Sequence, residues 1–331
     1  MYVGVACCDV LDWARSPAAW GGLFPDLEAL ELQPELVDRS DALLAWSPRT
    51  LADTIHRELP NLRWLDVHAP SSKWDLSSLR ADHRRHALDH AWYAYRWARE
   101  LGARAFVLHP GAHGWVSPGE RADRAERFAE SFAELARRWH AEIADSRAPR
   151  ILLENLEYAQ PCATPRELAY LVRQLHRQMP IGACLDVPHL WHSRRVLHLP
   201  ENGDHRATAL PPPDDSPTFG AYLDAALAVL NPYCELVHLA GCGLHRTHDP
   251  IRWTGNGGPP YLAGEPGEGV HAMLDLRPVL CRVFGNQLCP RPPALILEVY
   301  EGGLPALQES LARVISFRNG FRSAVGDASF R

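Results

Sequence analysis

The sequence predicts a (β/α)8 barrel, a closed ring of eight parallel strands surrounded by helices. The 331-residue chain contains eight short, continuous apolar runs, which is the pattern of strands buried on both faces. Stretches with helical periodicity separate these runs. Six of the eight runs end on a histidine, a glutamate or an aspartate. A closed barrel would gather those ends onto one rim, whereas an open sheet would leave them far apart.

Strands and helices are expected to alternate along the whole chain. The strands are predicted at residues 2–7, 27–32, 63–68, 104–109, 150–154, 181–186, 234–239 and 294–299. Long helices are predicted at 79–101 and 118–145, and shorter ones at 48–58, 165–178, 219–230, 275–284 and 304–318. This order is that of consecutive βα units, which favours a parallel sheet.

Three of the predicted helices have clear start signals. A capping hydroxyl precedes a first-turn proline at Ser47-Pro48, Ser117-Pro118 and Thr164-Pro165. Glu120 and Glu167 stand three residues after the second and third of these hydroxyls, at the spacing of a capping box. Both glutamates therefore support helices that begin after residues 117 and 164.

Two long segments interrupt the regular pattern. Residues 194–217 follow the sixth strand and residues 241–268 follow the seventh, so both loops are expected on the rim where the strands end. Long loops at such a position commonly cover a substrate. We expect one barrel domain over residues 1–320 and a C-terminal tail over residues 321–331.

Composition limits the class of protein. Apolar residues make up 46% of the chain, enough for a full core, and the net charge of −6 gives no basic field for tight non-specific nucleic-acid binding. The apolar N-terminal segment lacks the basic residues that precede the apolar part of a signal peptide. No apolar stretch reaches the ~18 residues that span a bilayer. We expect no membrane partner, a cytoplasmic location and free cysteines, while the oligomeric state stays open.

The residue types also exclude some mechanisms. Lys73 is the only lysine, so no phosphate-binding P-loop lysine is available, and a Schiff-base enzyme would have to use this residue in an expected loop. The glycine-rich segment 264–269 lacks the spacing of a dinucleotide fingerprint. Metal chemistry is the stronger hypothesis.

The strand ends supply a set of metal ligands. They are His68, His109, Glu154, Asp186, His238 and Glu298. Imidazole and carboxylate donors without thiolate suit zinc, manganese, iron or cobalt better than magnesium or calcium. We therefore expect one to three divalent cations per chain at the barrel rim.

Further polar residues could complete this centre. His189 follows Asp186 by three positions and could be another ligand or a donor to the substrate. His248 and Asp249, after the seventh strand, could hold an additional cation or be ordinary loop residues. Glu154 and Glu298 could each bridge two cations, or they could act as acid and base on a substrate between them.

At these residues the chain resembles the xylose isomerase-like TIM-barrel superfamily, which includes sugar isomerases, epimerases and nucleases of the endonuclease IV type. The resemblance is carried by HAP at 68–70, HPGAH at 109–113, LEN at 153–155, LDVPH at 185–189 and GEG at 267–269. It implies metal ligands at the six strand-end residues, with His189 available for a third ion.

A second resemblance concerns the segment after His238. HLAG at 238–241, THD at 247–249 and ENLEY at 154–158 are similar to multinuclear non-haem iron oxidases that modify cysteines in ribosomal peptides. The chain differs from those enzymes in having a histidine at 189, where they typically have asparagine. Nucleases of the endonuclease IV type, in turn, have an Asn-Asp pair after the seventh-strand histidine.

Three reactions are therefore compatible with the sequence. The first is isomerisation or epimerisation of a small sugar or polyol-like substrate, with Glu154 and Glu298 moving a proton and His189 orienting a hydroxyl. The alternatives are a hydrolase with two or three cations, including a phosphodiesterase that acts on nucleic acid, and an iron oxidase that acts on a peptide cysteine. Of these, the sequence favours the isomerase or epimerase, and hence a small-molecule substrate.

Overall fold

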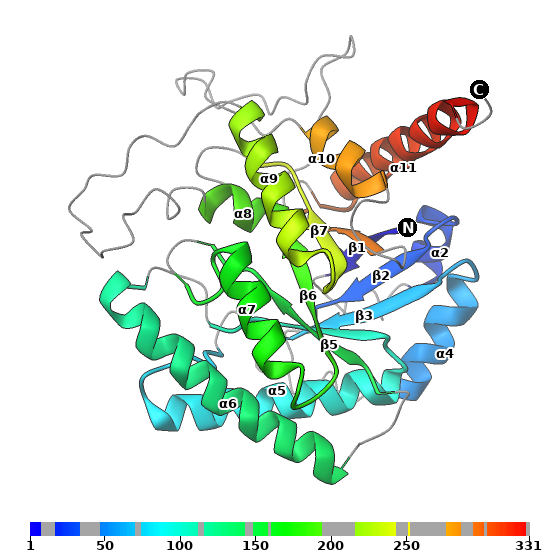
Figure 1. Ribbon diagram of the computed structural model, residues 1–331. Helices are drawn as coiled ribbons and strands as arrows, with labels where there is room; N and C mark the ends of the chain where they lie inside the picture. The colour runs from blue at the N-terminus through cyan, green and yellow to red at the C-terminus, as the bar shows by residue number, and fades with distance from the viewer. Residues whose placement is uncertain are drawn as a thin grey trace.

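The eight predicted strands form a closed parallel barrel in sequence order (Figure 1). The structure, a computed structural model, describes residues 1–7, 17–33, 47–69, 74–111, 116–142, 148–157, 160–193, 216–242, 251, 276–285, 294–300 and 303–328. The strands are β1 (Tyr2–Cys7), β2 (Ala29–Leu32), β3 (Trp64–His68), β4 (Ala105–Leu108), β5 (Arg150–Glu154), β6 (Ile181–Asp186), β7 (Cys234–Leu239) and β8 (Ala294–Leu297). The predicted fold class is confirmed, and each strand end lies within two residues of its predicted position.

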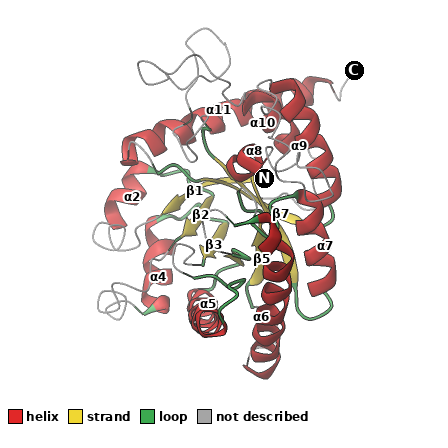
Figure 2. Ribbon diagram, turned by 90° about the vertical axis from the view of Figure 1, so that its left-hand side faces the viewer, coloured by secondary structure: helices red, strands yellow, loops and turns green. Residues whose placement is uncertain are grey.

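Helices surround the strands as an outer layer (Figure 2). The described helices are α2 (Pro17–Leu23), α4 (Pro48–Glu58), α5 (Ala81–Leu101), the 3-10 turn η1 (Pro118–Glu120), α6 (Arg121–Glu142), α7 (Pro165–Leu175), α8 (Val187–Ser193), α9 (Ser216–Leu230), α10 (Leu276–Phe284) and α11 (Gly303–Ala328). None of them is long and apolar enough to cross a membrane.

The expected start signals are found at two of the helices. At α4 the Ser47 hydroxyl accepts a hydrogen bond from the Thr50 amide at 3.1 Å. At α7 the Thr164 hydroxyl accepts from the Glu167 amide at 3.3 Å, and the Glu167 carboxylate accepts from the Thr164 amide at 3.2 Å, which completes the capping box. These bonds satisfy backbone donors that have no partner within the helix.

Some elements differ from the sequence prediction. The short helices α2 and α8 were not predicted, because each has only seven residues and shows little periodicity. The last helix runs to Ala328, so residues 321–328, which we expected to be a tail, are helical. No proline occurs after Pro305, and nothing in the backbone therefore ends that helix earlier. The greater part of the two predicted rim loops, 194–215, 243–250 and 252–268, lies outside the described residues.

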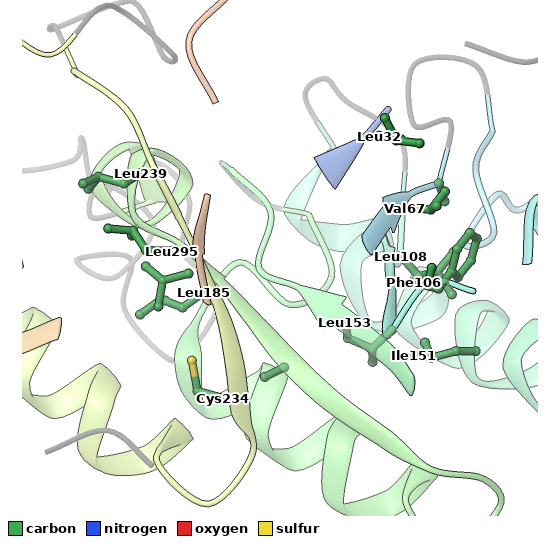
Figure 3. Close-up of a cluster of buried hydrophobic side chains, with 14 of the residues drawn as sticks. Leu32, Val67, Phe106, Leu108, Ile151, Leu153, Leu185, Cys234, Leu239 and Leu295 are labelled. Carbon is green, nitrogen blue, oxygen red and sulfur yellow. The ribbon is translucent and has the colours of Figure 1, made fainter. Parts of the chain in front are cut away.

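The side chains of each strand alternate between two cores. One set packs between strands and helices and includes Leu32, Val67, Phe106, Leu153 and Leu185 (Figure 3). The other set fills the barrel interior with small and medium side chains, namely Ala6, Ala29, Ala105, Val107, Leu152, Cys184, Leu236, Ala294 and Ile296. Several of these inward-facing residues are followed, two positions later, by a polar residue. Because side chains alternate along a strand, these polar residues also face inward, at the end of the barrel where the strands end.

The backbones of β1 and β2 approach each other closely at Gly4. A Cβ atom on Gly4 would lie 1.9 Å from the Ala29 carbonyl oxygen, so only glycine permits this approach. Gly4 pairs in register with Ala29, and two residues later Ala6 pairs with Glu31. Since Ala29 faces the barrel interior, Glu31 two positions later has the same direction and lies higher in the barrel.

Candidate metal centre

The barrel brings all six strand-end ligands together. His68, Glu154, Asp186 and His238 are the inward residues at or near the ends of β3, β5, β6 and β7, while His109 and Glu298 directly follow β4 and β8. None of the six residues is more than 5% exposed. Their strand positions thus place three imidazoles and three carboxylates in one buried cluster, which explains why the apolar runs end on these residue types.

Two donor groups made only of imidazoles and carboxylates can be distinguished within the cluster; a third group, Glu154, Cys184 and His238, includes a thiol whose pKa is raised well above its ordinary value by burial. The first, called subsite A here, consists of His68, His109 and Glu154. His68 Nε2 lies 3.1 Å from His109 Nε2 and 3.1 Å from Glu154 Oε2, and His109 Nε2 lies 3.2 Å from the same oxygen. Three donor atoms therefore converge on a single point.

The second donor group, called subsite B, consists of Glu154, Asp186, His238 and Glu298, whose donor atoms all lie within 4.8 Å of one another. His238 Nδ1 is 3.3 Å from Glu298 Oε2, 3.5 Å from Glu154 Oε2 and 4.0 Å from Asp186 Oδ2. One imidazole thus faces three carboxylates. Glu154 belongs to both groups.

In His68 and His238, the ring nitrogen that points away from the donor cluster (the outer nitrogen) forms a hydrogen bond, so the other ring nitrogen (the inner nitrogen) can bind a cation. His68 Nδ1 donates to the Ala69 carbonyl oxygen at 2.7 Å, which leaves the Nε2 lone pair toward subsite A. His238 Nε2 donates to Glu31 Oε2 at 2.9 Å, and the buried Nδ1 forms no hydrogen bond with the described residues. Metal-binding histidines usually show this arrangement, so the donor set fits a divalent cation.

The ionisable groups of the cluster shift one another's pKa values. Burial opposes ionisation of Glu154, but its contacts with His109, His238 and His189 outweigh burial and hold its pKa well below the ordinary value. Burial lowers the pKa of His68, yet its hydrogen bond to Glu154 raises that pKa to about 9. For His109 burial prevails and its pKa is lowered. Without a cation, protons on part of the cluster would therefore balance the carboxylates.

His189 lies in the first turn of α8, next to both subsites. Its Nδ1 is 3.0 Å from the Asn155 carbonyl oxygen, 3.0 Å from Glu154 Oε1 and 3.4 Å from Asp186 Oδ1. Burial lowers its pKa, but the Asp186 and Glu154 carboxylates raise it to about 10. The Asn155 side chain in turn holds the Asp186 backbone through bonds of 2.8 and 2.9 Å. The structure therefore brings His189 into the centre, as the sequence predicted.

Two predicted site residues cannot be placed. His248 and Asp249 lie outside the described residues, so their contribution of an additional cation stays a prediction.

Sequence reasoning missed the residues that surround the donors. Glu31 in β2 is fully buried and contacts His238, and Gln33 follows it. Tyr300, which is 46% exposed, lies beside Glu298. A charged residue inside the apolar run 27–32 was the available signal for Glu31. No local signal was available for Gln33 or Tyr300, because their contacts are formed only when the barrel closes.

Comparison with known proteins agrees with this geometry. Residues 27–273 match the model of the family described as xylose isomerase-like TIM barrel. The comparison with curated protein sequences gave no match.

Solved structures of similar fold include both sugar epimerases and a nuclease. L-ribulose 3-epimerase superposes with a TM-score of 0.64 at 14% identity, over 99% of this chain and 98% of that one. Endonuclease IV from Thermus thermophilus gives 0.59 at 17% identity, over 98% and 100%. The TTHB071 protein from the same organism, soaked with ZnCl2, gives 0.54 at 23% identity, over 96% and 98%. At these identities the likeness shows the fold alone.

Proposed function

The chain belongs to the xylose isomerase-like TIM-barrel family. Within this fold, we propose that it is a metal-dependent hydrolase whose centre binds two divalent cations and cleaves a phosphate ester. The observation that carries this proposal is the position of Glu154. Its Oε2 lies 3.1 and 3.2 Å from the ring nitrogens of subsite A and 3.5 Å from His238 Nδ1 in subsite B. A carboxylate shared by two donor groups is the arrangement that bridges paired cations in many phosphoesterases.

The charge and the donor types of the centre are compatible with two cations. Three carboxylates meet in the centre, and two of the histidines beside Glu154 have pKa values raised to about 9 and 10. A cation in subsite A would replace the proton of His68, and cations in both subsites would offset the charge of the carboxylates. The mixed nitrogen and oxygen donors suit zinc, manganese, iron or cobalt. When bound, such cations would activate water and polarise a phosphoryl group.

The chain's own residues would bind and orient the substrate. His189 is fixed through Nδ1 to the Asn155 carbonyl oxygen and lies beside both subsites, so its ring is the candidate to hold a substrate oxygen. Tyr300 lies at the exposed side of Glu298 and could contact the remainder of the substrate. The buried position of the six donor residues would keep bulk water away from the reacting group.

A second candidate is the isomerase or epimerase that the sequence favoured. The observation in its favour is the position of Glu298, which enters subsite B from β8 while Glu154 enters from β5. Two carboxylates from well-separated strands could remove and return a proton on different faces of a sugar held by one cation in subsite B. The iron oxidase hypothesis depends on the 247–249 segment, which lies outside the described residues.

The two candidates predict different products. The protein, purified without a tag and loaded with zinc, manganese, iron or cobalt, should be assayed on bis(p-nitrophenyl) phosphate and p-nitrophenyl phosphate. In parallel, a panel of ketoses should be incubated with it in D2O and examined by NMR for exchange of carbon-bound hydrogen. Phosphate-ester cleavage without exchange supports the hydrolase. Exchange without cleavage would contradict it and select the isomerase or epimerase.

A further inference from the structure

Glu31 reaches across the barrel interior to a metal-donor histidine. It is fully buried in β2, and its Oε2 accepts a hydrogen bond from His238 Nε2 of β7 at 2.9 Å. β1 and β8 separate these two strands in the barrel order, so the contact spans the interior rather than a strand pair. Glu31 therefore acts on the side of the ring that faces away from subsite B.

Gln33 extends the same contact to a second donor residue. Its amide nitrogen donates to Glu31 Oε1 at 2.9 Å and also contacts Glu298 Oε1. The Tyr300 hydroxyl lies 3.1 Å from Gln33 Oε1 and 3.2 Å from Glu298 Oε1. Glu298 Oε2 is thereby left facing His238 Nδ1 at 3.3 Å. Glu31 and Gln33 together contact two of the four residues of subsite B.

We propose that Glu31 and Gln33 are positioning residues that fix His238 and Glu298 for a cation in subsite B. This proposal rests on the proposed function. A carboxylate that accepts from Nε2 selects the tautomer with a lone pair on Nδ1 and makes that nitrogen a stronger donor. The amide of Gln33 holds one oxygen of Glu298 and so directs the other toward the same point.

A purely structural role explains Glu31 poorly. It pairs in register with Asp66 of β3, and neither side chain is exposed to solvent. Placing two carboxyl groups side by side in a buried barrel opposes folding, because each loses its hydration and because burial and the neighbouring Glu31 raise the pKa of Asp66 well above its ordinary value. An apolar residue at this position would oppose folding less. The contact with His238 gives a reason for a carboxylate there.

The test compares two substitutions at Glu31 with one at a nearby structural carboxylate. Glu31→Gln keeps an acceptor of the same shape, and Glu31→Leu removes it. Glu28→Gln is the matched control, because Glu28 directly precedes β2, accepts from the Val3 amide at 3.2 Å and contacts Arg318. Zinc affinities of the two subsites are measured by competition with a chromophoric chelator, and unfolding is followed by circular dichroism.

The expected result is a selective loss at one cation. Glu31→Gln should weaken one of the two zinc affinities about 10-fold and Glu31→Leu about 100-fold, while the other stays within about twofold. Glu28→Gln should lower the melting temperature and leave both affinities unchanged. Unchanged affinities in a folded Glu31→Leu protein, or an equal loss at both cations, would overturn the positioning role.

A second measurement needs no cation and separates this inference from the proposed function. Proton and nitrogen-15 NMR of metal-free protein at neutral pH should find the His238 Nε2–H proton shifted downfield by its hydrogen bond to residue 31 in the wild type and in Glu31→Gln. In Glu31→Leu this downfield shift should be lost. The same Nε2–H shift in all three proteins would overturn the inference. A wild type that binds fewer than two cations but shows this change of shift would overturn only the two-cation function.

Discussion

Glu154 and His238 face each other inside the barrel, with Glu154 Oε2 3.5 Å from His238 Nδ1. The same oxygen is 3.1 Å from His68 Nε2, so one carboxylate is in contact with imidazoles from β3 and β7. Since the outer nitrogens of these two rings are already bonded to Ala69 and Glu31, the inner nitrogens are directed toward Glu154. This geometry is what the two-cation proposal depends on.

Substituting Glu154 should affect both cations at once. Glu154→Gln removes the shared charge while preserving the shape of the side chain, so both affinities should fall by at least about 100-fold and activity should be lost. Elemental analysis and circular dichroism would measure metal content and fold. Glu134→Gln, on the surface of α6, is the control. A folded Glu154→Gln protein with full metal content and full activity would exclude Glu154 from the centre.

Substituting His109 should affect only one cation. His109 contributes to subsite A and is absent from subsite B, so His109→Ala should reduce the zinc content from two ions per chain to one. The measurement is elemental analysis after dialysis against a weak chelator. Loss of both ions would show that the subsites do not bind independently, and retention of both would remove His109 from the ligand set.

Cation binding should release protons. Burial lowers the pKa of His68, but Glu154 raises it to about 9 without a cation, so this ring is protonated at pH 7 and must lose a proton to become a ligand. Affinity should therefore rise between pH 7 and pH 9. Calorimetry in two buffers of different ionisation enthalpy would count the protons. Equal heats in both buffers at pH 7 would contradict the expected charge state.

The stability of the metal-free protein should fall at alkaline pH. Although burial lowers the pKa of His68, Glu154 raises it to about 9, above the value of ~6.5 in an unfolded chain. The protonated ring therefore stabilises the fold fully below about pH 6.5, and this stabilisation is lost as the pH rises through about 9. The melting temperature of metal-free protein should decrease from pH 6.5 to pH 9. His68→Gln should flatten this decrease, and an unchanged slope in that variant would contradict the assignment.

The barrel interior should not tolerate a larger residue at position 4. Gly4→Ala would place a Cβ atom 1.9 Å from the Ala29 carbonyl oxygen and should lower the free energy of unfolding by about 3 kcal/mol. Gly22 in α2 has no atom within 4 Å of the corresponding position, so Gly22→Ala should raise it by roughly 0.5–1 kcal/mol. Urea denaturation measures both changes. Equal stabilities of the two variants would contradict the packing described here.

The strands, and the place of the candidate donor residues at their ends, could be predicted because the signals are local. A strand buried on both faces is a short apolar run, and a barrel places the residue at its end on the rim. His68, His109, Glu154, Asp186, His189, His238 and Glu298 all follow this rule, or lie within three residues of such an end, and all lie in the centre. The family match confirms the resemblance that the same motifs indicated.

The surrounding contacts could not be predicted in the same way. Glu31 and His238 are separated by 207 positions, and Gln33 and Glu298 by 265. Such pairs depend on the register of eight strands and on barrel closure, which no local pattern encodes. The division of the donors into subsites A and B could not be predicted either, because only the interatomic distances place Glu154 in both subsites.

The central claim is that Glu154 lies between two cations. The most direct test is anomalous X-ray diffraction from crystals loaded with zinc, recorded on both sides of the zinc absorption edge. We predict two anomalous peaks about 3.5–4 Å apart, one beside His68 and His109 and one beside Asp186, His238 and Glu298, with the Glu154 carboxylate in contact with both. A single peak, or two peaks of which only one contacts Glu154, would contradict the claim.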